Sequence, residues 1–331
     1  MNSPGTAHTT KKVALRLMRS CGIFAAARAM SAPMARILMY HNFAASSEDP
    51  NAVSVDALRH QFEYLRRHFS IVPLRHIIDR LKMGAKWQNH VAALTIDDGR
   101  RNCYEVMFPL LREFEIPATF FIVSSFISGQ DWIWTDKVLW LSEQPHRPSE
   151  LDPEQLDGFF RSMNQLRPGA RTTFIDSIAK RMGVTIPLSP PPKYAPCSWR
   201  ELREMAYSDL VEIGSHSISH PIFANLTDGE SWQELVISRT QIEEGIGRKV
   251  RYFCFPNGQL GDYRPSQLRQ VRDAGYEGAV AAHAGMVSTA TDPYKLPRIG
   301  VSGKSDMLSF SKQLDGADHY QIKIQKLFGL A

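Results

Sequence analysis

Short apolar runs alternate with stretches of helical periodicity along most of this chain. Val91–Ile96 is a continuous, partly β-branched apolar run, as expected of a strand that is buried on both faces. Residues 55–69 instead repeat their apolar side chains at helical spacing with basic residues between them, which predicts a helix that packs on a core. This alternation of strands and helices predicts an α/β fold.

The same patterns predict the other regular elements. Strands are expected at residues 36–42, 71–72, 117–124, 250–255 and 277–281, and helices at residues 74–82, 101–114, 198–206, 235–246 and 264–275. Ser198 and Glu201 have the spacing of a capping box, in which each side chain bonds to the other residue's backbone at the start of a helix. Phe120 and Phe121, inside a predicted strand, are expected in the core.

Two segments depart from this regular pattern. Residues 125–196 are irregular: they hold three closely spaced tryptophans, weak helical periodicity over residues 151–182, and a stiff proline-rich stretch at 187–196. We interpret them as an insertion. Residues 1–34 form a basic arm without acidic residues, in which arginines interrupt the apolar stretch that a signal peptide would need. An amphipathic helix fits better, either on an anionic membrane surface or packed on the rest of the protein.

Composition narrows the class of protein. The chain has 331 residues, of which 43% are hydrophobic and 22% charged, as in ordinary globular proteins. The net charge of +5 is concentrated in the arm, and basic residues are not interleaved with aromatic ones, so no nucleic-acid partner is expected. Four scattered cysteines without a C-x-x-C pair fit a reducing compartment. We therefore expect a cytoplasmic protein; membrane association and secretion remain open alternatives.

The candidate chemistry begins at the end of the apolar run Val91–Ile96, where Asp97, Asp98 and Gly99 follow directly. Carboxylates beside an apolar core are costly unless they are paired or bind a metal. Gly99 supplies a tight turn that lets both carboxylates reach one pocket. An ordinary Asp-Gly turn that closes a strand is the alternative.

A second polar group follows another short strand, in the segment VEIGSHSISH. Its His216 and His220 are four residues apart, so a helical turn after Ser215 would place both imidazoles on one face. Together with one carboxylate they would form a two-histidine, one-carboxylate metal site that keeps a position open for water. A lone histidine pair is more often a surface or core feature, but the aspartate pair makes a metal site the sharper prediction.

These two segments resemble a known family. TIDDG and HSISH are similar to the first two motifs of the polysaccharide deacetylases (carbohydrate esterase family four), T-F-D-D-G and H-[ST]-x-x-H, with Ile96 in place of Phe. The resemblance extends from about Ile37 to Val301. It implies a distorted (β/α) barrel of about seven strands over residues 35–310, with the insertion at about 125–196 and a C-terminal tail at 311–331.

The resemblance also implies roles for the polar residues. Asp97 would be the catalytic base, and Asp98, His216 and His220 would hold a divalent metal, zinc first, with cobalt or nickel as alternatives. The implied reaction is removal of N-acetyl groups from hexosamine residues of a polysaccharide or lipid-linked oligosaccharide. A deformylase or deacylase of another amide, and a carbohydrate-binding protein that has lost catalysis, are the rival hypotheses.

Two further positions are expected to contact substrate. Pro256-Asn257-Gly258 resembles the third family motif, in which Asn257 would donate to an oxyanion; an ordinary turn is the alternative. Cys254 stands where that motif commonly has arginine. Arg298 would then supply the missing orienting charge, with an ordinary surface arginine as the alternative.

The family's late Leu-x-His motif, the source of its general acid, is absent from this sequence. His41, at the end of the first predicted strand, is the leading substitute because strand ends line the active site of barrels; a core histidine is the alternative. Trp132 and Trp134 could stack on sugar rings, although anchoring of the insertion on the barrel is the favoured interpretation.

Overall fold

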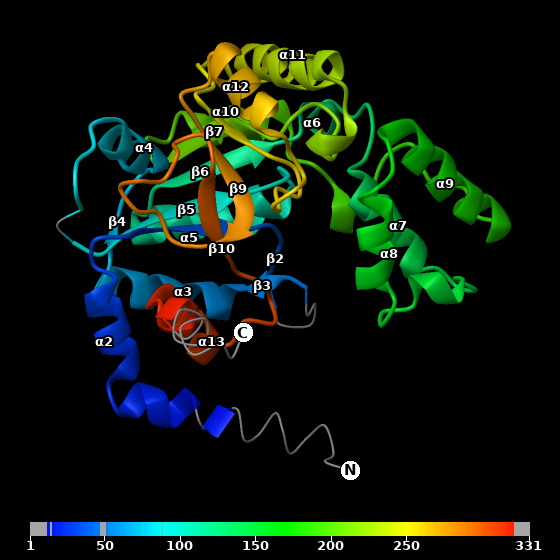
Figure 1. The fold of residues 1–331 in the computed structure, drawn as a ribbon. Coiled ribbons are helices and arrows are strands. Elements are labelled where there is room, and N and C mark those ends of the chain that lie inside the picture. Colours follow the sequence, from blue (N-terminus) through cyan, green and yellow to red (C-terminus); the bar gives the residue numbers. More distant parts are fainter. Residues whose placement is uncertain (1–11, 14, 47–50, 88, 321–331) are drawn as a thin grey trace.

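A closed barrel of parallel strands forms the centre of the molecule (Figure 1). The computed structural model describes residues 12–13, 15–46, 51–87 and 89–320. Within them, seven strands pair in the cyclic order β1, β5, β6, β7, β8, β9, β10 and back to β1. Their bounds are Ala35–Tyr40, Val91–Ile96, Ala118–Ile122, Val211–Ser215, Tyr252–Cys254, Gly278–Ala284 and Leu296–Gly300. The predicted distorted barrel of about seven strands is confirmed.

Strand β5 is buried along its whole length. All six of its residues are buried, and it pairs along its whole length with β1. On its other edge, the short β4 (Ser70–Ile71) pairs with its start and β6 with its end. The continuous apolar run that predicted this strand therefore reflects burial on both faces. A separate pair, β2 (Phe43–Ala44) and β3 (Val53–Ser54), lies beyond the end of β1.

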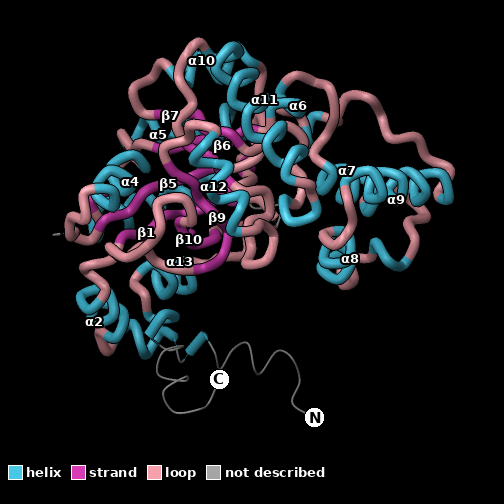
Figure 2. Tube along the Cα trace, turned by 45° about the horizontal axis from the view of Figure 1, so that its top comes forward, coloured by secondary structure: helices cyan, strands magenta, loops and turns pink. Residues whose placement is uncertain are grey.

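Helices surround the barrel (Figure 2). They are α3 (Val55–His68), α4 (Leu74–Lys82), α5 (Phe108–Phe114), α10 (Trp199–Ala206), α11 (Asp228–Ile246), α12 (Pro265–Asp273) and α13 (Met307–Leu314), with short turns at η1 (Cys103–Met107) and η4 (Phe223–Asn225). Helix α3 buries Leu58, Phe62 and Leu65, as its periodicity predicted. The predicted capping box between Ser198 and Glu201 is present at the start of α10.

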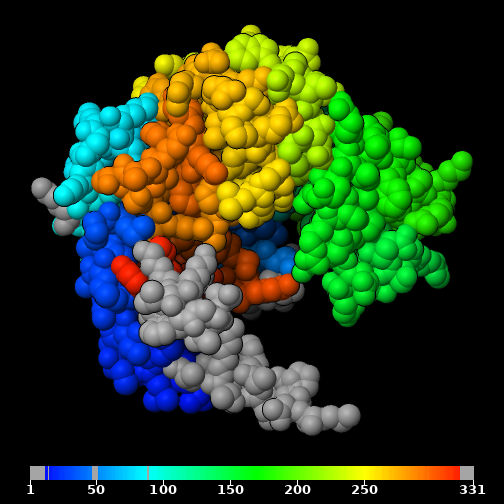
Figure 3. Space-filling model, in the orientation of Figure 1, coloured from blue at the N-terminus to red at the C-terminus, as the bar shows by residue number. Residues whose placement is uncertain are grey.

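The insertion forms a helical lobe beside the barrel (Figure 3, green). Helix α6 (Ser124–Ile127) leads into it and packs on α11 and the main core (Figure 1), and the lobe contains α7 (Trp134–Ser142), η2 (Ser149–Leu151), α8 (Leu156–Met163), α9 (Pro168–Arg181) and η3 (Pro192–Tyr194). The lobe has a small core of its own around Val138, Leu151 and Ile178. Trp132 and Trp134 are only 4% and 8% exposed, which supports anchoring rather than sugar stacking.

The two ends of the described chain pack together. In α2 (Ile23–Met30), Phe24 and Ala27 are buried in a cluster with Ala317. Helix α13 passes through residue 310, and Leu314 is fully buried. The tail predicted at 311–331 therefore includes residues that pack with the folded unit, as far as Ala317. Residues 321–331 lie outside the described part. Most of the basic arm is described, but residues 1–11 and 14 are not. Among the described residues, no helix combines the length and apolarity needed to cross a membrane.

Candidate active site

The backbone turns sharply where β5 ends, and this turn separates the two aspartates. Asp98 and Gly99 both have positive φ, 76° and 83°, a conformation that glycine adopts readily and most residues avoid. A Cβ on Gly99 would lie 2.9 Å from Cγ2 of Ile122. Position 99 therefore requires glycine. The turn that glycine allows places Asp97 and Asp98 next to different side chains.

Asp97 is held by a buried arginine. Nη1 and Nη2 of Arg298 donate to its two carboxylate oxygens over 2.8 and 2.6 Å, and each of these side chains is about 1–2% exposed. Burial would raise the pKa of Asp97, but the charge and hydrogen bonds of Arg298 lower it below its ordinary value. Arg298 also donates to Thr95 and to the Ala281 carbonyl. These contacts support a role of Arg298 in orienting Asp97, and its burial excludes the surface alternative.

Asp98 meets the two histidines on the other side of the turn. Its Oδ1 lies 3.8 Å from Nε2 of His216 and 3.7 Å from Nε2 of His220. These separations are too long for hydrogen bonds but match ligand atoms that surround one ion with bonds of roughly 2.1 Å. Burial lowers the pKa of both histidines, that of His220 to about 3, so both rings are neutral and able to bind metal at neutral pH.

The two histidine rings are fixed in different ways. Nδ1 of His216 lies 2.8 Å from the Cys254 carbonyl oxygen, and because a carbonyl only accepts, Nε2 of His216 carries the free lone pair. Nδ1 of His220 is buried without a partner among the described residues. His220 is held through its backbone instead: its N–H donates to Ser217 over 3.0 Å, and its carbonyl accepts from the indole of Trp134 over 3.2 Å.

The segment between the histidines is a tight loop, so the predicted helical turn is wrong. Ser217 and His220 both have positive φ, 71° and 55°. Glu234 of α11 stabilises the loop, because its carboxylate accepts from the backbone N–H of Ile218 and of Ser219. The rings converge through this loop geometry, with centroids 4.8 Å apart.

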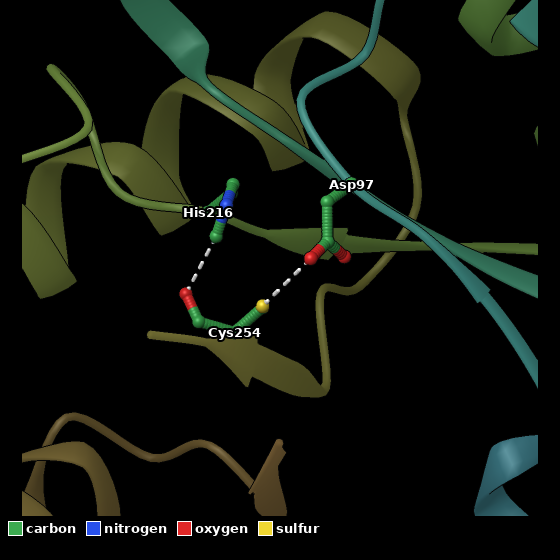
Figure 4. Close-up of side chains that lie close together, drawn as sticks. All are labelled: Asp97, His216 and Cys254. Atoms are coloured by element: carbon green, nitrogen blue, oxygen red, sulfur yellow. Dashed lines mark hydrogen bonds between the residues drawn. The ribbon is translucent and has the colours of Figure 1, made fainter. Parts of the chain in front are cut away.

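A second group of metal-ligating atoms lies beside the first (Figure 4). Asp97, His216 and Cys254 also bring ligand atoms within 4.8 Å of one another, and the Cys254 thiol lies 3.6 Å from Asp97. In this group, however, the negative charge of Asp97 is already balanced by Arg298. Burial raises the pKa of the Cys254 thiol, which keeps the thiol protonated. The donor set of Asp98, His216 and His220 therefore fits a divalent ion better.

His41 and Asn257 have different surroundings. His41 directly follows β1, its side chain is 41% exposed, and its Nε2 lies 3.6 Å from Oδ2 of Asp97. It therefore lies at the open side of the same pocket, which excludes the core alternative. The side-chain amide of Asn257 donates to Asp262 within its own loop over 2.5 Å. Its donation to an oxyanion stays a prediction.

Sequence reasoning missed one ion pair next to the metal-ligand group. Arg100 contacts Asp98, with Nη2 3.3 Å from Oδ2, and donates to Asp136 of α7 over 2.5 and 3.2 Å. Asp136 is fully buried, and burial raises its pKa to about 6 in spite of the arginine. Asp136 is one of two carboxylates in the tryptophan-rich segment, with Asp131, and nothing in the sequence connects it with Arg100.

Comparison with known proteins agrees with the geometry. The sequence model of the family described as polysaccharide deacetylase matches residues 85–279, more than half of the chain. The chain is 21% identical over 307 residues to poly-β-1,6-N-acetyl-D-glucosamine N-deacetylase of Escherichia coli K12; the match covers 84% of this chain and 38% of that protein. This chain thus spans less than half the length of that relative.

Solved structures share the fold. The Streptococcus pyogenes deacetylase PplD, in complex with acetate, superposes with a TM-score of 0.59 at 14% identity, over 86% of this chain and 99% of that one. IcaB from Ammonifex degensii gives a TM-score of 0.57 at 19% identity, over 86% and 97%. The barrel, with an aspartate pair after one strand and a histidine pair after another, is of the carbohydrate-esterase type. The chain belongs to the polysaccharide deacetylase family.

Proposed function

We propose that this protein is a metal-dependent deacetylase that removes N-acetyl groups from hexosamine residues of a polysaccharide or a lipid-linked oligosaccharide. The observation that carries the proposal is one pocket that joins a candidate metal site, Asp98 with His216 and His220, to a separately held carboxylate, Asp97. A protein that only binds carbohydrate needs neither. Family membership and the relative's N-deacetylase activity support the same reaction.

Amide hydrolysis divides into steps that these residues can perform. A divalent ion on Asp98, His216 and His220, zinc first, with cobalt and nickel also suited to the mixed nitrogen and oxygen donors, would supply Lewis acidity and a water of lowered pKa. Asp97 stays charged through Arg298 and can accept the proton of the attacking water. His41, on the exposed side of Asp97, is placed to protonate the leaving amine.

A groove next to His41 supports a polymeric substrate. Its volume is about 690 Å³, and its lining combines polar side chains such as Asn42, Asn102 and Lys193 with apolar ones such as Phe43 and Val106. Asn42, the residue after His41, is part of its lining. Polar groups in a shallow groove suit the hydroxyl and amide groups of a sugar chain. We therefore expect longer oligomers to be better substrates than N-acetylglucosamine itself.

The test is acetate release from β-1,6-linked N-acetylglucosamine oligomers of increasing length with added zinc, together with zinc titration calorimetry. The parent protein should release acetate, Asp97→Asn should bind zinc without turnover, and His216→Ala should lose both zinc and turnover. Zinc binding without acetate release from any oligomer would favour the deformylase or another deacylase. A parent that neither binds zinc nor releases acetate would support the carbohydrate-binding alternative.

We also propose that this protein is located in the cytoplasm and contacts anionic membrane through its basic arm. Phe24 and Ala27 are used for packing, whereas Leu17 and Met30 are 60% and 59% exposed beside the exposed Arg16 and other basic residues. Exposed apolar and basic side chains together suit an anionic lipid surface, where each basic residue contributes about 1 kcal/mol.

Co-sedimentation with phosphatidylglycerol and phosphatidylcholine vesicles tests membrane contact. The parent should bind the anionic vesicles only, and Arg16→Glu combined with Arg19→Glu should abolish binding. Arg248→Glu combined with Lys249→Glu makes the same charge change in a basic cleft elsewhere on the surface and should leave binding intact. Equal loss in both double variants, or no binding by the parent, would overturn the membrane proposal.

A further inference from the structure

The start of helix α7, in the insertion, reaches the pocket with two side chains. Trp134 and Asp136 are two residues apart, and they are 8% and 0% exposed. Trp134 contacts the loop that carries the histidines, whereas Asp136 contacts the turn that carries the aspartates. One turn of an inserted helix thus touches both segments that supply the candidate metal ligands.

Asp136 acts on Asp98 through Arg100. The guanidinium donates twice to Asp136, over 2.5 and 3.2 Å, and its Nη2 lies 3.3 Å from Oδ2 of Asp98. Because Asp98 and Asp136 are buried, Arg100 is only 11% exposed, and the three side chains carry one positive and two negative charges, one negative charge remains for a cation. Without Asp136, Arg100 would be free to pair fully with Asp98 and to compete with a metal for it.

Trp134 acts on His220 through the backbone. Since Nδ1 of the His220 ring has no partner in the described part of the chain, the ring's place depends on the two backbone bonds of the residue. One of these is the indole N–H of Trp134 donating to the His220 carbonyl over 3.2 Å. The indole is itself fixed, because the guanidinium of Arg171 from α9 lies 4.3 Å from the centre of its ring.

We propose that Trp134 and Asp136 of the insertion are positioning residues for the metal site. They act on different candidate ligands: Asp136 tunes the charge and orientation of Asp98, and Trp134 sets the position of His220. The insertion is therefore part of the active site rather than an appended lobe. This inference rests on the metal site of the proposed function. Residues that support metal ligands typically change metal affinity by about 10–100-fold when they are substituted.

Zinc affinity of the full chain, measured by calorimetry without substrate, tests the proposal, and the absorption spectrum of bound cobalt reports ligand geometry. Asp136→Asn is expected to weaken zinc binding by about 10–100-fold. Trp134→Phe keeps an aromatic ring but removes the N–H donor, and we expect a loss of about threefold to tenfold together with an altered cobalt spectrum. Circular dichroism and thermal melting establish that each variant is folded.

The insertion offers a matched control for the tryptophan and a surface control for the aspartate. Trp132 is also buried and donates its indole N–H to a backbone carbonyl, that of Leu188 over 3.3 Å, away from the pocket. Asp131 is a surface carboxylate, 58% exposed, that pairs with Lys137 instead of with Arg100, so its substitution controls for the chemical change alone. Trp132→Phe and Asp131→Asn should therefore leave zinc affinity and the cobalt spectrum unchanged.

The outcomes separate this inference from the proposed function. If the parent binds no zinc, the proposed function fails and this inference fails with it. If the parent binds zinc and Asp136→Asn and Trp134→Phe bind it equally well, only this inference is overturned. A loss of affinity as large in the control variants would likewise overturn it, because it would reflect general loosening of the insertion. If Asp136→Asn does not fold, Trp134→Phe against Trp132→Phe decides the question.

Discussion

The two halves of the pocket are supported from different parts of the molecule. Asp97 is held entirely from within the barrel, by Arg298 of β10, which is itself fixed by Thr95 of β5 and by the carbonyl of Ala281 in β9. Asp98 and His220 are contacted from the insertion, through Asp136 and Trp134. The orientation of the proposed base is thus built into the strands, whereas the candidate metal ligands also depend on a segment that enters between β6 and β7.

The largest expected effect separates the two halves directly. Asp97→Asn removes the proton acceptor but leaves Asp98 and the histidines in place, so deacetylation should fall by about 10²–10⁴-fold. Zinc affinity should change by less than about threefold, a small effect compared with loss of a ligand. Acetate release and zinc calorimetry on the same preparation measure both quantities.

Asp98→Asn is the matched control, because it makes the same chemical change one residue further along. It should lose zinc affinity as well as activity. If Asp97→Asn lost zinc as severely as Asp98→Asn, both carboxylates would act in one ligand set, and the separation of the two halves would be wrong.

The second effect concerns stability. Arg298→Leu would leave the carboxylate of Asp97 buried without its partner, and breaking a buried ion pair in this way costs about 3–5 kcal/mol in free energy of unfolding. Urea denaturation measures the loss. Arg28→Leu is the comparison, because Arg28 also pairs with a buried aspartate, Asp315, but is itself more exposed. We expect a smaller loss of stability for Arg28→Leu. Equal losses in the two variants would show that the deeper burial of the pair of Arg298 and Asp97 adds nothing to its contribution to stability.

The sequence predicted the structure best where a single short segment determines the local backbone and its burial. The apolar run followed by Asp97, Asp98 and Gly99 predicted both a buried strand and its turn, because burial and positive φ constrain residue types locally. The helical turn at His216 was wrong because the spacing of two residues cannot distinguish a helix from a loop held by Glu234. Arg298 was offered as an orienting charge or a surface residue, and its buried pairing with Asp97 excludes only the surface alternative.

The pair of Arg100 and Asp136 could not be predicted, for a physical reason. The two residues are 36 positions apart, and they meet only because the insertion folds back onto the strand ends. Their pairing depends on tertiary packing, which neither periodicity nor a motif records. The same holds for Trp134, whose contact with the His220 carbonyl involves a backbone atom that any residue would supply.

The smallest expected effect tests whether the barrel also supports the metal side of the pocket. Glu234 of α11 accepts from Ile218 and Ser219 in the loop between the histidines. Glu234→Gln keeps the size of the side chain but weakens these charge-assisted bonds, so we expect stability to fall by about 1–2 kcal/mol. Zinc affinity should fall several-fold, less than for Asp136→Asn.

Glu230→Gln provides the comparison on the same helix. Glu230 completes the capping box with Thr227 at the start of α11, so its substitution should cost a similar amount of stability, about 1 kcal/mol, without a change in zinc affinity. If Glu234→Gln weakened zinc binding more than Asp136→Asn did, the barrel would be the main support of the histidine loop. The insertion would then support only Asp98, through Asp136 and Arg100. The difference between the support of Asp97 and that of the metal ligands would be limited to this one contact.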